Sequence, residues 1–154
     1  MDIPTLQTEV TSRLPQRARW LTPDGTPLDF TFYSVPRRLA DLLTTEGCQV
    51  DSSATLTAFG EYDYAGGGGA RPWLAINDAD SRVYAIDVES DEPAALLNSS
   101  LQAFIQTFCF LDKFASKREP LPSSIVPLVE ECDPEAYPNS EWRYWVDYLV
   151  AHNP

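Results

Sequence analysis

Acidic and tyrosine side chains gathered in short stretches are the residues of this chain best suited to do chemistry. Residues 61–64 alternate acids with tyrosines, and residues 78–92 hold six acids and one arginine. The ten candidates are Glu61, Tyr62, Asp63, Tyr64, Asp78, Asp80, Asp87, Glu89, Asp91 and Glu92. Carboxylates beside tyrosines suit an interface that holds a basic protein. We therefore expect one composite acidic surface, with Trp73 as a further aromatic anchor, to which Glu130, Glu131, Asp133 and Glu135 add. The alternative is that each cluster is only a solvated face.

Patterns typical of catalysis or metal binding are incomplete in this sequence. The three cysteines are not closely paired, and the one histidine, His152, lies two residues from the end, which disfavours zinc and Ser-His or Cys-His chemistry. The glycine run 66–69 lacks the Lys-Ser/Thr of a phosphate loop, and Val83 stands where a calcium loop starting at Asp78 needs glycine. We expect no enzyme, cofactor or metal, although sequence spacing leaves a hydrolase with a carboxylate pair open.

Net charge narrows the class of partner. The 154 residues carry −12 at pH 7. Residues 1–46 hold six acids and five arginines, which gives −1, so −11 belongs to residues 47–154. Nucleic-acid backbones and anionic membranes need a basic surface, so we expect neither as a partner. Unpaired cysteines, an N-terminus unlike a signal peptide and no apolar run long enough to span a membrane lead us to expect a cytoplasmic protein.

Hydrophobic spacing predicts the elements that must position these acids. Four helices are expected. The first three are one over 6–14 that Pro15 ends, one from Pro36 to Gly47, and one opened by a Ser99–Gln102 capping box. A last helix with Ser140 near its start carries an apolar face, Trp142, Trp145, Val146 and Leu149. Strands are expected at 19–21, 30–33, 55–59, 73–76 and 83–86, the last two as a hairpin.

Short turns between successive strands imply antiparallel pairing, so the fold class is α+β rather than a parallel α/β series. We expect a single domain in which a twisted, mainly antiparallel sheet is flanked by helices. Residues 1–34 are assigned to an N-terminal arm of uncertain placement, and residues 35–154 to the main domain.

Several short motifs, taken in their order, resemble the SUKH superfamily of bacterial immunity proteins, particularly its fourth group. The helix from Pro36 to Gly47, Phe59-Gly60 at a strand end and the hairpin formed by 73–77 and 82–87 are similar to that family. The opening of the long helix over 97–104, with its Asn-Ser-Ser-Leu-x-x-Phe pattern, resembles it too. So do Asp133-Pro134 and the later Trp142. Asp80-Ser81 departs from it, because a glycine often precedes the second strand there.

The resemblance covers about residues 35–150 and implies an α+β fold without a catalytic centre. Bacterial members bind and neutralise the toxin domain encoded beside them, and many such toxins act on nucleic acids. The resemblance therefore implies an immunity protein that binds a cognate toxin with a basic active-site surface. The alternative is a non-catalytic regulatory or scaffold module that binds a cell-envelope or signalling protein.

Overall fold

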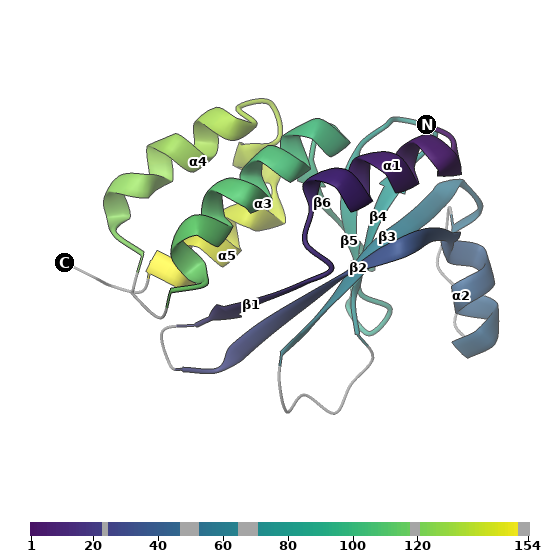
Figure 1. The fold of residues 1–154 in the computed structure, drawn as a ribbon, viewed down its shortest axis with the longest axis horizontal. Helices are drawn as coiled ribbons and strands as arrows, with labels where there is room; N and C mark the ends of the chain where they lie inside the picture. Colours follow the sequence, from purple (N-terminus) through teal and green to yellow (C-terminus); the bar gives the residue numbers. More distant parts are fainter. Residues whose placement is uncertain (23–24, 47–52, 65–70, 118–120, 151–154) are drawn as a thin grey trace.

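A six-stranded antiparallel sheet forms the centre of the computed structural model, which describes residues 1–22, 25–46, 53–64, 71–117 and 121–150. The strands follow one another in chain order, so each pairs with its sequence neighbours (Figure 1). Their bounds are β1 Arg17–Leu21, β2 Pro27–Arg38, β3 Leu56–Tyr64, β4 Trp73–Asn77, β5 Val83–Ile86 and β6 Ala94–Asn98. The described helices are α1 Ile3–Arg13, α2 Leu39–Glu46, α3 Leu101–Ala115, α4 Val126–Cys132 and α5 Glu141–Val150. The predicted single-domain α+β fold is confirmed.

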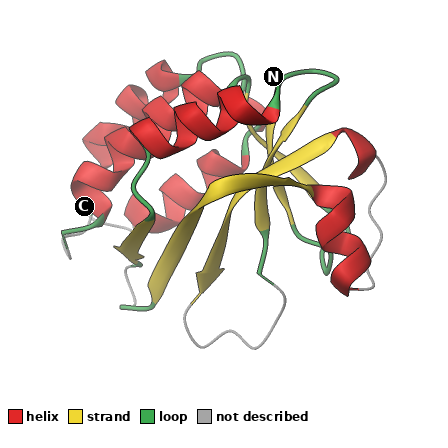
Figure 2. Cartoon of the chain, turned by 45° about the vertical axis from the view of Figure 1, so that its right-hand side comes forward, coloured by secondary structure: helices red, strands yellow, loops and turns green. Residues whose placement is uncertain are grey.

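The two faces of the sheet are covered unequally. Helices α1, α3, α4 and α5 lie on one face, where their apolar side chains join the strands in the main core (Figure 2). Helix α2 lies on the other face, where Leu39 and Leu43 pack on a second, smaller cluster. Beside α2, the second face over β1–β3 is lined by polar side chains and faces solvent. The site described below lies on this open area.

The first 34 residues belong to the same sheet and core. Helix α1 buries Leu6 and Val10 against the strands, and Asp2 caps its first turn by accepting a hydrogen bond from Thr5 N at 2.8 Å. Strand β1 buries Trp20, whose Nε1 donates to Asp112 of α3 at 2.8 Å. The segment that we assigned to an N-terminal arm, as a helix and/or strands of uncertain placement, thus provides α1, β1 and most of β2.

The helix predicted to begin at Pro36 begins instead at Leu39, because β2 continues to Arg38. The register between β2 and β3 shifts between Phe32 and Arg37. Pro36 lies in this irregular stretch, where its missing N–H costs no ladder hydrogen bond. Strand β3 likewise continues past Phe59-Gly60, which we expected at a strand end, and extends to Tyr64. The expected helix end at Gly47 lies outside the described residues.

Helix α3 begins as predicted but is capped by a different serine. Ser100 accepts the hydrogen bond of Ala103 N at 3.1 Å, so the predicted Ser99–Gln102 capping box is wrong. Gln102 instead donates to Glu9 of α1 at 3.2 Å. Ser99 is drawn away from the cap because its hydroxyl donates to Asp133 at 2.8 Å.

A buried polar network joins β6, α3 and the segment before α5. The carboxylate of Asp133, only 5% exposed, accepts four hydrogen bonds: Ser99 N at 2.7 Å, Asn98 Nδ2 at 3.0 Å, Ser99 Oγ at 2.8 Å and Ala136 N at 3.3 Å. The amide oxygen of Asn98 accepts from Trp142 Nε1 at 2.6 Å. Residues of two motifs that carried the family resemblance therefore meet in space, where they hold the fold together.

Candidate functional site

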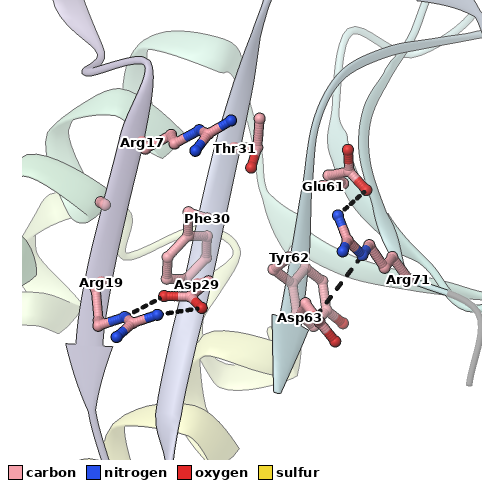
Figure 3. Close-up of a pocket in the computed structure, with 10 residues that line it drawn as sticks. Arg17, Arg19, Asp29, Phe30, Thr31, Glu61, Tyr62, Asp63 and Arg71 are labelled. Atoms are coloured by element: carbon pink, nitrogen blue, oxygen red, sulfur yellow. Dashed lines mark hydrogen bonds and ion pairs between the residues drawn. The ribbon is translucent and has the colours of Figure 1, made fainter. Parts of the chain in front are cut away.

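A groove of about 510 Å³ runs across the open face of β1, β2 and β3 (Figure 3). Its charged side chains are three arginines and three acids: Arg17, Arg19, Arg71, Asp29, Glu61 and Asp63. Three of the ten residues predicted from the sequence, Glu61, Tyr62 and Asp63, line this groove together with arginines that we did not single out.

Strand alternation and register explain why these side chains meet. Side chains two residues apart on a strand share a face. The register pairs Arg17 with Thr31 and Thr31 with Glu61, which makes one row across the three strands. A second row pairs Arg19 with Asp29 and Asp29 with Asp63. The groove is therefore two parallel rows of polar side chains, each with an arginine on β1 and an acid on β3.

Ion pairs neutralise most of the charge in this groove. Arg19 donates two hydrogen bonds to Asp29, at 2.7 and 3.1 Å, and this contact raises the pKa of the guanidinium. Arg71 lies 3.7 Å from both Glu61 and Asp63. The guanidinium of Arg17 has no ion pair within the described residues. The groove is consequently balanced in charge rather than acidic, and Arg17 is its most available cation.

Asp78 and Asp80 lie at the opposite end of the sheet from Glu61. Strand β4 pairs Trp73 with Glu61 at one end and Asn77 with Leu56 at the other, and Asp78 follows Asn77. Five residues of strand span about 16 Å. The ten predicted residues therefore do not form one continuous surface, and a partner would meet Asp78 and Asp80 on a different side from Glu61 and Asp63.

The side chains of Asp78 and Asp80 are engaged in shaping their hairpin. Asp78 forms an ion pair with Arg38 at 2.5 Å. Asp80 accepts from Arg82 N at 2.9 Å and from the hydroxyl of Tyr84 at 2.6 Å. Partial burial and this bond to a carboxylate raise the pKa of Tyr84 to about 12. These contacts give both acids a structural role.

Among the ten predicted residues, those of the turn between β5 and β6 carry the carboxylates with the fewest partners. Asp87 accepts from Glu89 N at 3.0 Å and so shapes the turn. Glu89, Asp91 and Glu92 are exposed, and none has an ion pair within the described residues. Ile86 pairs with Trp73, which pairs with Glu61, so this turn lies at the same end of the sheet as the groove. We call Asp87, Glu89, Asp91 and Glu92 the acidic turn.

Two of the three aromatic residues expected as anchors are buried. Tyr62 is 7% exposed and packs edge-on against Trp145 at 5.0 Å between ring centroids. Trp73 is 5% exposed and belongs to the smaller cluster under α2. Neither ring is free to insert into a partner, which corrects the expectation for both. Tyr64 ends β3, and its side chain lies outside the described residues.

The exposed tyrosines lie on α5 instead. Tyr144 is 69% exposed and Tyr148 is 50% exposed, and with Trp145 they border a small groove of about 80 Å³ beside Leu28. Our sequence reasoning missed them because it followed only the apolar face of this helix. Their spacing of four residues, off that face, was the available signal.

The remaining chemistry-bearing groups form no centre in the described residues. No group of three or more His, Cys, Asp or Glu side chains in these ranges could hold a metal ion. Cys109 and Cys132 are free, and burial raises the pKa of both thiols. Cys48, His152 and the glycine run 66–69 lie outside the described ranges. No described helix has the length and apolar character needed to cross a membrane.

Comparisons with protein-family models, with curated proteins and with solved structures find no match to this chain.

Proposed function

We propose that this protein is a non-catalytic immunity protein that binds and neutralises a basic cognate toxin domain. The observation that supports the proposal is the acidic turn, where Glu89, Asp91 and Glu92 are exposed without an ion pair in the described residues. The motif resemblance to SUKH immunity proteins supplies the class of partner. The acidic turn replaces the wider surface expected from the sequence as the first contact.

Electrostatics favours this turn over Glu61, Asp63 and Asp78. Three carboxylates within four residues create a local negative potential that attracts a basic protein and speeds its association. Glu61 and Asp63 contribute less because Arg71 lies against both, and Asp78 contributes less because Arg38 neutralises it. A basic toxin surface built to hold phosphates offers the complementary charge, so the turn acts as a phosphate mimic.

The first test asks whether the chain protects cells against the toxin domain encoded by a neighbouring gene. Cells that produce this toxin domain are expected to survive when they also produce the protein. Absence of both binding and protection would contradict the immunity function and favour the regulatory or scaffold alternative.

The second test locates the surface. The triple variant Glu89→Lys, Asp91→Lys and Glu92→Lys is expected to weaken toxin binding, and to do so more at low salt than at high salt. Reversing the exposed Glu130, Glu131 and Glu135 changes the net charge equally and serves as the control. Equal binding by the two triple variants would rule out the acidic turn as the contact while leaving the immunity function standing.

A further inference from the structure

Strand β1 is an edge of the sheet, and its outer backbone groups are available. It is the first strand in the sheet order and pairs with β2 alone (Figure 1). In an antiparallel pair, alternate residues direct their N–H and C=O groups toward the partner strand, and those between direct them away.

Two backbone hydrogen bonds at the ends of β1 show which of its residues direct their backbone groups away from β2. Phe32 N donates to Gln16 O at 2.9 Å, and Thr22 N donates to Thr26 O at 3.0 Å. The backbone N–H and C=O groups of the even-numbered residues from 16 to 22 therefore point toward β2. Arg17, Arg19 and Leu21 direct their backbone N–H and C=O groups to the open edge, where no described residue accepts from or donates to them.

The other edge strand, β6, differs at its C-terminal end, where side chains bond to its backbone and to the residue that follows it. Ser140 Oγ donates to Leu97 O of β6 at 2.5 Å, and Asp133 accepts from Ser99 N just after this strand. The side chain of Asn98 is held by Trp142 and Asp133. Side chains from the segment 133–142 thus cover the C-terminal end of β6, and no described side chain hydrogen-bonds to the outer backbone groups of β1.

The side chains along β1 favour a binding partner that carries negative charge. Arg17 and Arg19 project onto the open face, both are exposed, and Arg17 has no ion pair within the described residues (Figure 3). Arg19 uses its Nε and one Nη on Asp29, so its other Nη remains able to donate. A recess of about 570 Å³ lined by Arg19, Leu21, Gly25, Pro27 and Ser116 adjoins the edge and offers room.

We propose that the β1 edge binds an extended segment of a partner protein that carries carboxylates at alternate positions. The segment adds a seventh strand by hydrogen bonding to Arg17, Arg19 and Leu21, and its carboxylates lie opposite the two arginines on the open face. Pairing with β1 of a second copy is disfavoured, because the two-fold arrangement centred on this strand places Arg19 opposite Arg19. This site is separate from the acidic turn, so it does not depend on the proposed function.

Amide hydrogen exchange by NMR on the full chain tests the proposal. The probe is a capped seven-residue peptide of alternating threonine and glutamate. Its addition is expected to protect the amides of Arg17, Arg19 and Leu21, which exchange fast in the free protein, while those of Ala18 and Trp20 are already protected. Replacing glutamate by lysine in the peptide, or methylating its backbone nitrogens, is expected to abolish the effect.

A variant pair tests the role of the arginines. Arg17→Ala with Arg19→Ala is expected to weaken binding of the glutamate peptide roughly tenfold. Arg37→Ala with Arg143→Ala changes the net charge equally at exposed positions elsewhere and is expected to leave it unchanged. The proposal is overturned if millimolar glutamate peptide protects none of the three amides, if the lysine or methylated peptide binds equally, or if both variant pairs behave alike.

Discussion

Replacing Asp133 by alanine is expected to lower the free energy of unfolding by about 4 kcal/mol, within a range of about 2 to 6. The carboxylate is buried and accepts four hydrogen bonds. After its removal Asn98 Nδ2 keeps Thr107 as a partner at 3.3 Å, and the half-buried hydroxyl of Ser99 can turn to water. Ser99 N and Ala136 N lose their partner, and each such orphaned donor costs about 1–3 kcal/mol.

Asp133→Asn separates hydrogen bonding from shape. The amide oxygen can keep Ser99 N and Asn98 Nδ2, while its nitrogen faces the hydroxyl of Ser99, which can accept, and Ala136 N, which cannot. Only one backbone donor, Ala136 N, therefore loses its acceptor instead of two, and we expect the free energy of unfolding to fall by about 1–3 kcal/mol. Glu131→Gln, at an exposed neighbouring position, is the control and is expected to stay within about 0.5 kcal/mol of the wild type.

Urea unfolding followed by far-ultraviolet circular dichroism measures all three variants on one scale. The expected order of destabilisation is Asp133→Ala, then Asp133→Asn, then Glu131→Gln. A loss below about 1 kcal/mol for the alanine variant, or an asparagine variant at least as unstable, would refute the idea that orphaned donors make this network costly to break.

Three further predictions concern single positions. Gly60→Ala is expected to destabilise the fold by about 1–3 kcal/mol, because a Cβ would lie 2.8 Å from the carbonyl oxygen of Thr31; urea unfolding measures this. Ser100→Ala is expected to cost about 1 kcal/mol as the loss of a helix cap, and more than Gln102→Ala in the same assay. In an alkaline absorbance titration one tyrosine is expected to ionise near pH 12 and to be missing in Tyr84→Phe. Because this pKa lies above the usual 10, Tyr84 stabilises the fold fully below pH 10, and that contribution is lost as the pH rises through about 12.

The sequence predicts well those elements whose signals are local and repeated. Two short apolar runs around a turn-rich loop identify the hairpin of β4 and β5, and a regular apolar stripe identifies α3. Strand β6 was missed because Ala94–Asn98 is short and has neither β-branched nor aromatic residues. The helix start predicted at Pro36 was wrong, because a proline at a helix start and a proline in an irregular strand cannot be distinguished until the strand register is known.

The candidate site shows a different limit of sequence reasoning. The acids were found, but their grouping was not, because strand pairing decides that Asp78 lies far from Glu61 and that the acidic turn lies on the same side as the groove. The ion-pair partners of these acids could not be predicted either, because Arg71 lies near both Glu61 and Asp63 although it follows them by several residues in the sequence. The direction of Tyr62 depends on which face the helices cover, and nothing within residues 61–64 specifies it.

The position of the Asp133 network near the end of the chain has a consequence for biosynthesis. All six strands are complete at Asn98, whereas the side chains that cover β6 come from residues 133–142. A chain made from its N-terminus therefore contains all six strands, with both edge strands exposed and Asn98 without Asp133 and Trp142, before it contains the residues that cover the end of β6. Premature termination before residue 133 yields a product with both edges exposed, which is the form most prone to aggregate.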